Sequence, residues 1–249
     1  QTFRVGVARL SSAGPGTFSV PDELVGAGPL NFNFSSACAL AGDLLLIVAD
    51  GLTGDFDASG PLEQAEAHAR ALLADSAVEN LPHIAAWREA FRSFGAKPQR
   101  TRNSLEALTR RAPDGLPRIN ALTDAYNAVS VLHQLPGGGE NLDAYRGAAR
   151  LVRATGEEPF ETVAGGEPAI EHPKPGEVVW RDDAGVTCRI WNWRQCTRTQ
   201  LRDDTRRALF ILDALAPMDD DKLMAAGDHL QAVLRTGSPG AVTGSRLVR

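Results

Sequence analysis

Cysteine and long apolar runs are scarce in this 249-residue sequence, and each shortage narrows the range of possible proteins. The cysteines are Cys38, Cys188 and Cys196, an odd number without a CxxC pair. This argues against a disulfide framework or a structural zinc site and is typical of a reducing compartment. The longest apolar run, LLLIVA at 44–49, is too short to cross a bilayer and fits a buried strand. Because no export signal is visible, we expect a cytoplasmic protein without a membrane partner.

The motifs of several enzyme classes are missing as well. The sequence contains no Walker loop, dinucleotide fingerprint, HExxH or nucleophile elbow. Its five histidines do not cluster at the spacings of metal ligands. We therefore expect no cofactor and no metal site. No nucleophile-plus-base pair can be selected from the residues alone.

Charge is unevenly distributed along the chain. The formal net charge of −5 argues against indiscriminate nucleic-acid binding. Residues 88–118 hold eight Lys or Arg against three acids, a local +5, and residues 181–207 hold seven Arg against four Asp, a local +3. The rest of the chain therefore carries −5 − 8 = −13. Two interpretations stay open: salt-bridged helix surfaces, or arginines that bind an anion such as phosphate.

Hydrophobic periodicity predicts blocks of helices and blocks of strands. Strands are expected over 2–10, 43–50 and 207–215, with a hairpin over 176–191. Helices are expected from Pro61, over 81–95, after the capping residue Asn103, from Asn120, and from about 219 to 237. We expect a flexible tail over 238–249. Because no βαβ rhythm appears, the sequence predicts an α+β fold in a single domain over 1–249.

Three local features carry their own predictions. Ile119 is expected in the apolar stripe of the helix from Asn120. The following PGGG at 136–139 is interpreted as a glycine turn, or else as a segment that brings backbone amides to an anion. His83, on the first turn of its helix, is expected to be exposed.

Six segments between Trp87 and Asp213 stand in a distinctive order. They are WREAFRSFGAKPQRTRNSLEALTRR, LPRINALTDAYNAVS, LPGGGENLD, LVRATGEEPF, PGEVVWRDD and CRIWNWRQCTRT, the last followed by DDT. In this order they resemble the B3/B4 tRNA-binding domain, the editing domain of the phenylalanyl-tRNA synthetase β subunit, and more closely its free-standing relatives. The resemblance is strongest over 87–213. It implies an α+β fold with a central, mostly antiparallel sheet flanked by helices.

The resemblance also implies a function in translation quality control. In the synthetase this domain hydrolyses the ester that joins a wrong amino acid to tRNA, some free-standing relatives do so in trans, and one branch removes canavanine from arginine tRNA. The expected partner is thus an aminoacylated tRNA 3′ end and the expected activity is deacylation. Such an ester is already activated, so a positioned water and a stabilised oxyanion can suffice. The alternatives are a tRNA-binding module without catalysis and a small-molecule hydrolase or sensor.

The segment CRIWNWRQCTRT at 188–199 holds two of the four tryptophans. By the resemblance, it stands where the synthetase domain has a glycine-rich loop lining its editing pocket. If the segment is extended, alternation places Asn192 and Arg194 on one face and Trp191 and Trp193 on the other. We expect Asn192 and Arg194 to be catalytic. Trp191, Trp193 and Gln195 would bind the substrate, the tryptophans as a packed wall or as a stacking platform for adenine.

The resemblance suggests further site residues. Gly138 falls where the synthetase domain has a histidine, so that mechanism cannot transfer intact, and Gly138 is expected to line the pocket instead. Asp213, which we also expect to be catalytic, is the nearest match to the acid that reads the amino-acid side chain, offset by two residues, and suits a guanidino-type group. Tyr126 and Asn127 are also expected in the pocket.

Phosphate contacts are expected from Arg102, Arg110 and Arg111 in the first basic segment. A solvated helix face is the rival interpretation of these arginines. His133, one turn before the glycines, could replace the missing histidine or lie on the helix surface. The sequence does not indicate an oligomeric state.

Overall fold

The computed structural model describes residues 17–19, 31–34 and 42–248. Its strands are β1 (Thr17–Ser19), β2 (Asn31–Phe34), β3 (Asp43–Asp50), β4 (Gly137–Asn141), β5 (Ala149–Arg153), β6 (Phe160–Ala164), β7 (Glu167–Glu171), β8 (Val178–Arg181), β9 (Val186–Arg189), β10 (Arg194–Gln195), β11 (Arg207–Ala214) and β12 (Val242–Val248). The α-helices are α1 (Ser59–Ala74), α2 (Pro82–Ser93), α3 (Ser104–Arg111), α4 (Ala121–His133) and α5 (Asp220–Gly237). Short 3₁₀ helices are η1 (Val78–Asn80), η2 (Ala112–Asp114) and η3 (Leu142–Ala144).

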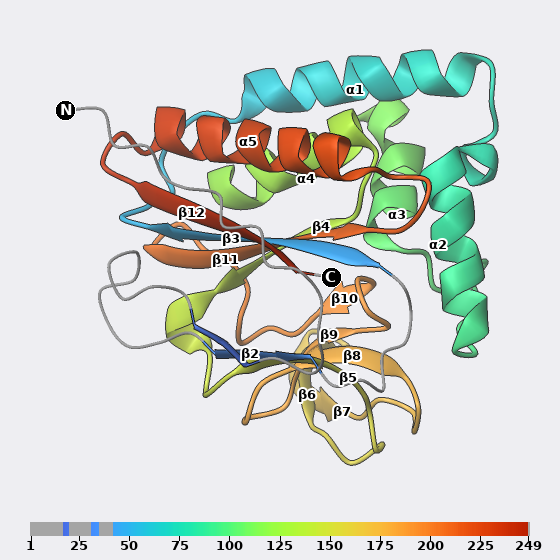
Figure 1. The fold of residues 1–249 in the computed structure, drawn as a ribbon, viewed down its shortest axis with the longest axis vertical. Coiled ribbons are helices and arrows are strands. Elements are labelled where there is room, and N and C mark those ends of the chain that lie inside the picture. The colour runs from blue at the N-terminus through green and yellow to red at the C-terminus, as the bar shows by residue number, and fades with distance from the viewer. Residues whose placement is uncertain (1–16, 20–30, 35–41, 249) are drawn as a thin grey trace.

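A four-stranded antiparallel sheet, in the order β12-β3-β11-β4, lies at the centre of the molecule. Helices α4 and α5 cover one of its faces, and α1 packs on α4 on the side away from the sheet (Figure 1). Strand β11 is buried on both faces: Phe210 and Leu212 belong to the core shared with α4 and α5, whereas Leu209 and Ile211 belong to a second core. This double burial explains the nearly continuous apolar run of the strand.

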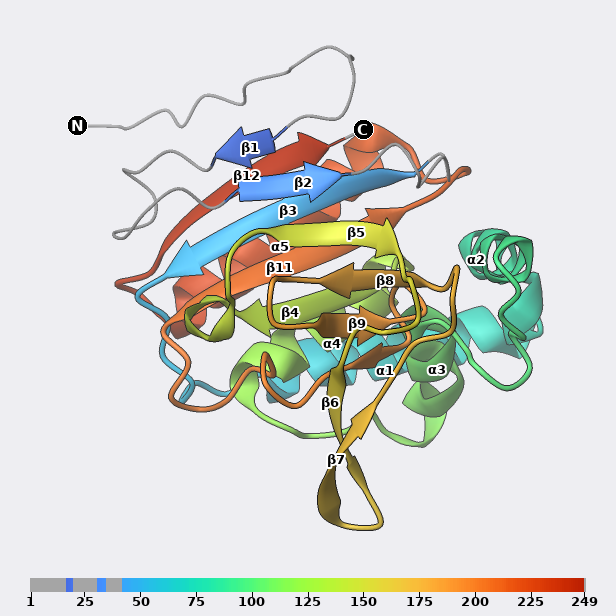
Figure 2. The same cartoon turned by 90° about the horizontal axis from the view of Figure 1, so that it is seen from below.

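The second core lies between this sheet and a six-stranded one with the order β1-β2-β5-β8-β9-β10. Figure 2 shows this second layer from below, with the β6–β7 hairpin projecting from it. Only β2 and β5 pair in parallel; the other described strand pairs are antiparallel. The α+β fold with mostly antiparallel sheets flanked by helices is therefore confirmed.

The helices predicted after Asn103 and from Asn120 are confirmed, and so is the cap predicted at Asn103. The Asn103 side chain accepts a hydrogen bond from the Glu106 amide at 2.9 Å, and the Asn120 side chain accepts one from the Thr123 amide at 2.9 Å. Each bond satisfies a backbone donor that the first helical turn leaves unpaired. The hairpin β8–β9 and the helix that ends at Gly237 also agree with the sequence pattern.

The flexible tail expected over 238–249 is not what the structure contains. Residues 242–248 form β12, which pairs with β3 along its whole length, from Val242 opposite Asp50 to Val248 opposite Leu44. The segment is poor in apolar residues, so local pattern gave no strand signal. Its order comes from the open edge of the buried strand β3, which offers a row of backbone partners.

Other local expectations were also wrong. The glycines at 137–139 form strand β4 rather than a turn. Glycine has little preference for strands by itself, and β11 supplies the backbone hydrogen bonds that hold this segment extended. Ile119 is 62% exposed and lies before the helix. His83 is buried: its Nε2 accepts the Leu215 amide at 3.0 Å, which leaves Nδ1 to donate to the Gln134 carbonyl at 2.8 Å. The strand expected over 2–10 lies outside the described residues.

Candidate active site

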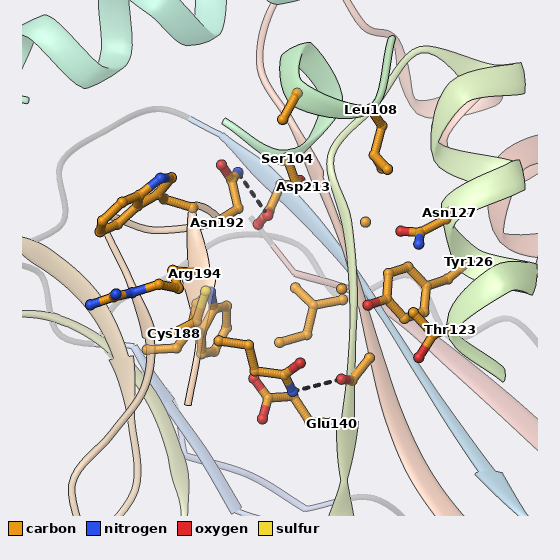
Figure 3. Close-up of a pocket in the computed structure, with 18 of the residues that line it drawn as sticks. Ser104, Leu108, Thr123, Tyr126, Asn127, Glu140, Cys188, Asn192, Arg194 and Asp213 are labelled. Carbon is orange, nitrogen blue, oxygen red and sulfur yellow. Dashed lines mark hydrogen bonds between the residues drawn. The ribbon is translucent and has the colours of Figure 1, made fainter. Parts of the chain in front are cut away.

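A cavity of about 310 Å³ lies beside edge strand β4, between α4, the start of α3 and the connection from β9 to β10 (Figure 3). This volume is within the range of small-molecule sites. Its lining contains all the residues expected above to be catalytic or substrate-binding: Tyr126, Asn127, Gly138, Trp191, Asn192, Trp193, Arg194, Gln195 and Asp213. Residues from four separate stretches of the sequence thus converge on one cavity.

Strand β4 forms one wall of the cavity and has an open backbone edge. The Asp213 amide donates to the Pro136 carbonyl at 3.0 Å, so alternation directs the peptide groups of Gly138 toward β11 and those of Gly137 and Gly139 away from it. The Gly139 carbonyl agrees with this, because it accepts from Gln195 Nε2 at 2.8 Å. The outward amides of β4 therefore face the edge along which the cavity lies.

The three glycines of β4 are not equivalent. A Cβ atom at Gly138 would meet nothing within 4 Å, whereas one at Gly139 would lie 2.9 Å from Tyr126 Cε1. Gly138 is opposite Ile211 in the register, on the face that also carries Asp213. The missing side chain at Gly138 therefore leaves open space next to Asp213, and glycine at 139 allows Tyr126 to pack on the strand.

Asp213 is the buried acid of the cavity. It is 2% exposed and accepts hydrogen bonds from Trp191 Nε1 and Asn192 Nδ2, each at 3.1 Å. Figure 3 shows the second of these bonds, with both side chains at the cavity. Burial raises the pKa of Asp213 to about 6, against the lowering effect of the two donors. The carboxyl is therefore mostly ionised at pH 7.5, and its pKa is close enough to this pH for it to take up and release a proton.

The segment that carries Trp191 and Asn192 is a turn, so the expected extended conformation is wrong. Strand β9 ends at Arg189, β10 begins at Arg194, and Ile190 and Trp191 have φ values of 48° and 60°. Non-glycine residues rarely adopt this left-handed region. The Trp191 amide, which donates to the Val178 carbonyl at 2.7 Å, helps to hold the turn in place.

The turn, rather than strand alternation, directs the Trp191 side chain into the core and the Asn192 side chain toward the cavity. Trp191 is 2% exposed and packs edge-to-face on Trp87, with ring centroids 5.0 Å apart. Asn192 is half-buried and reaches Asp213. Trp191 is thus a core residue, as expected for the tryptophans, and it also donates to the acid of the cavity.

Arg194 lines the cavity but directs its guanidinium elsewhere. The head group donates to Glu171 on β7 and lies 5.0 Å from the centroid of the Phe160 ring and 4.9 Å from that of Trp193. In Figure 3 it points away from Tyr126 and Asn127. These contacts tie β10 to the β6–β7 hairpin.

Glu140 is a lining residue that the sequence analysis missed. It follows the three glycines, lies on the same face as Gly138, and is buried. Burial raises its pKa to about 8, so the carboxyl is mostly protonated at neutral pH. The alternation of β4 could have indicated it, had the glycine segment been recognised as a strand.

Three buried polar atoms of lining residues, apart from the Arg194 guanidinium, have no hydrogen-bond partner among the described residues. They are Ser104 Oγ, Glu140 Oε2 and Asn192 Oδ1. Folded proteins rarely leave such atoms unpaired, because each one costs roughly 1–3 kcal/mol. Their concentration around one cavity is the pattern expected of a site that binds a polar ligand.

Comparison with known protein families identifies the family of the chain. Residues 86–235 match the family described as B3/4 domain. The chain belongs to the B3/4 domain family. This confirms the family resemblance suggested by the six ordered segments.

Among solved structures, the B3/4 chain is similar to an N-terminal fragment of the phenylalanyl-tRNA synthetase β subunit from Pyrococcus horikoshii. The sequence identity is 12% and the TM-score is 0.39. The match covers 82% of this chain and 46% of that one, so the chain spans less than half the length of that fragment. No curated protein matches the chain.

The arginines expected to bind phosphate do not line the cavity of the B3/4 domain. Arg88 and Arg110 donate to the buried carboxylate of Glu106 at 2.6 and 3.0 Å, and Arg102 lies 3.8 Å from it. The outer surface of α3 is thus largely a salt-bridged helix face. Arg111 is exposed.

In residues 17–19, 31–34 and 42–248, no three or more His, Cys, Asp or Glu side chains lie together as a metal site requires. No helix in those ranges is long and apolar enough to cross a membrane.

Proposed function

We propose that this B3/4 domain is a free-standing deacylase, which hydrolyses the ester bond of a mischarged tRNA in trans. The observation that carries the proposal is the convergence of Asp213, Asn192 and the glycine edge of β4 on one polar cavity. Family membership supports the choice of an aminoacylated tRNA end as the ligand. Since charged tRNA is used in the cytoplasm, we place the activity there.

The proposed reaction uses the chain's own groups and one water. Asp213, ionised at pH 7.5, takes a proton from the water as its oxygen attacks the ester carbonyl carbon. The oxyanion that forms accepts a hydrogen bond from the outward amide of Gly139. When the intermediate collapses, the bond to the ribose oxygen breaks and that oxygen takes up the proton. The products are a free amino acid and intact tRNA.

The other lining residues would position the acyl group. The unpaired Oδ1 of Asn192 can accept a hydrogen bond from the substrate, and the protonated carboxyl of Glu140 can donate one. Tyr126 and Asn127 on α4, with Gln195 and Trp193 opposite, bound the space available to the amino-acid side chain. Arg194, expected to be catalytic, is assigned a positioning role through its contact with Glu171.

The test is incubation of the purified chain with tRNAs mischarged on arginine, phenylalanine and isoleucine acceptors. We expect ester loss above the spontaneous rate for at least one of them, and loss of this excess in Asp213→Asn. An ester half-life equal to that in buffer across the whole panel would contradict the proposal.

The second candidate is a tRNA-binding module without catalysis. It is favoured by Gly138, which stands where the resemblance leads one to expect histidine, and by the Arg194 guanidinium, which is held by Glu171. Asn192→Ala separates the two functions. In a deacylase it lowers turnover and leaves the Kd for tRNA nearly unchanged, whereas in a binding module it weakens binding.

A further inference from the structure

A second cavity, of about 490 Å³, lies on the other side of the turn that carries Asn192. Trp193, beside this turn, lines both cavities. The remaining walls come from the loop after α2, the segment before β8, and the end of β9: Phe94, Gly95, Ala96, Lys97, Arg100, Thr101, Lys174, Pro175, Glu177, Arg189 and Ile190.

The charge of this second cavity is strongly positive. Lys97, Arg100 and Lys174 are exposed, and no ion pair joins them to a carboxylate of the residues that the structure describes. Glu177 is already neutralised by Arg189, whose Nη2 and Nε donate to it at 2.8 and 2.9 Å. The five charged lining residues therefore sum to four positive and one negative, +3.

Two of these cations, Lys97 and Arg100, lie on an ordered loop after α2. The amides of Arg100 and Thr101 donate to the Lys97 carbonyl at 2.8 and 2.9 Å, and the Thr101 hydroxyl donates to it as well. Three residues on, the Ser104 amide donates to the Asn192 carbonyl at 3.1 Å. The cationic loop is thus bonded directly to the turn that borders the candidate active site.

We infer that the second cavity binds phosphodiester groups of the RNA whose acylated 3′ end occupies the first cavity. This rests on the proposed function. A strand that places its last nucleotide in the first cavity must leave past one of its walls, and Trp193 is the wall shared with the cationic cavity. Cations that are not consumed by carboxylates are the groups that neutralise phosphates. Arg88 and Arg110, which donate to Glu106, are less available for this role.

The experiment compares two variants with equal loss of charge. One is Lys97→Gln/Arg100→Gln/Lys174→Gln; the matched control is Arg70→Gln/Arg206→Gln/Lys222→Gln, which removes three exposed cations elsewhere. The Kd for uncharged tRNA is measured between 50 and 200 mM salt. We expect the first variant to raise Kd at least tenfold and to reduce the slope of log Kd against log salt by about 2, as loss of three single-strand contacts predicts. In the control variant, the changes in Kd and in the slope should each be less than half of those in the first variant.

Two further arms keep this inference separate from the proposed function. Deacylation of an aminoacyl-adenosine, which has no upstream phosphate, should be equal in the wild type and the first variant. If no substrate is deacylated but the Kd difference persists, the phosphate site stands without the enzyme. Equal Kd values for the two triple variants would overturn it. Tight binding of inorganic phosphate with no salt-dependent tRNA binding would overturn it too, in favour of a small anion.

Discussion

At the scale of the residue, Asp213 shows how surroundings decide chemistry. The same carboxyl on an exposed strand end would be an ordinary solvated acid. Here it is buried beside Trp191 and Asn192, which belong to the turn between β9 and β10 that contains the left-handed residues Ile190 and Trp191. Burial favours the neutral acid and the two donors favour the carboxylate, and the balance leaves the pKa at about 6.

The first prediction concerns this carboxyl directly. Asp213→Asn keeps the shape and removes the base, so kcat for deacylation should fall by roughly 10²- to 10⁴-fold while Kd for tRNA stays within about twofold. Single-turnover kinetics and a binding titration measure the two quantities. A rise in Kd with kcat unchanged would instead assign Asp213 to ground-state binding.

The second prediction is a pH dependence whose direction follows from the same pKa. In the proposed reaction the ionised form of Asp213 acts as base, so enzymatic kcat should rise with pH up to about 6 and then level off. The spontaneous hydrolysis rate at each pH is subtracted first. Asp213→Asn should lack this inflection, and an unchanged inflection in the variant would assign it to another group.

The third prediction separates two neighbouring glycines. Gly138→Val places its side chain in open space on the Asp213 face, so the fold should persist while KM rises or kcat falls. Gly139→Ala is the smaller change, yet its Cβ would lie 2.6 Å from Leu201 Cδ1 and 2.9 Å from Tyr126 Cε1. It should cost about 1–3 kcal/mol of unfolding free energy. Denaturant melts of both variants provide the comparison.

At the scale of the element, the first residues of helix α3 link its N-cap, Asn103, to the turn at Asn192 that borders the cavity. Its N-cap Asn103 is buried and bonds the Glu106 amide, and the next residue, Ser104, donates its amide to Asn192. The helix start therefore buttresses the turn. The edge strand β4 does the same from the other side, through the Gln195 contact with the Gly139 carbonyl.

The fourth prediction tests this helix start. Asn103→Ala removes the cap acceptor and should lower the unfolding free energy by about 1–2 kcal/mol, whereas Asn103→Ser, which keeps an acceptor, should lose only a fraction of that. Urea titrations measure both. Because Ser104 contacts the turn, Asn103→Ala should also reduce deacylation more than Asn103→Ser. Equal activity in the two variants would show that the turn keeps its conformation without the capped helix start.

At the scale of the whole molecule, the active cavity lies where two sheets and two helices meet. Burial there raises the pKa of Glu140 from 4.5 to about 8. A raised acid pKa stabilises the folded state below 4.5, and this contribution is lost as the pH rises toward 8. The neutral acid is thus part of the low-pH stability of the protein.

The fifth prediction follows from that linkage. Between pH 6 and 8 the unfolding free energy of the wild type should fall relative to that of Glu140→Gln, by roughly 1–3 kcal/mol in total. Asp213 contributes little to this window, because its pKa of about 6 lies at its lower limit. Urea unfolding at pH 6, 7 and 8 measures the difference; parallel curves for the two proteins would show that Glu140 ionises normally.

Much of the architecture follows from the sequence alone. The apolar run at 43–50, the run at 207–214 and the capping asparagines each encode their element locally, by period or by a side-chain hydrogen bond within three residues. Order and identity of the segments from Trp87 to Asp213 also determined the family, and with it the set of residues around the cavity.

Tertiary structure decided what depends on partners far along the chain. β12 and β4 are strands because β3 and β11 provide their hydrogen bonds, although neither segment favours a strand by itself. The left-handed turn at Ile190 and Trp191, the turning of Arg194 toward Glu171, and the burial of Glu140 all arise from packing. Short-range pattern records a residue's own preferences; the direction of a side chain and the pKa of a buried acid are set by neighbours that only the fold brings near.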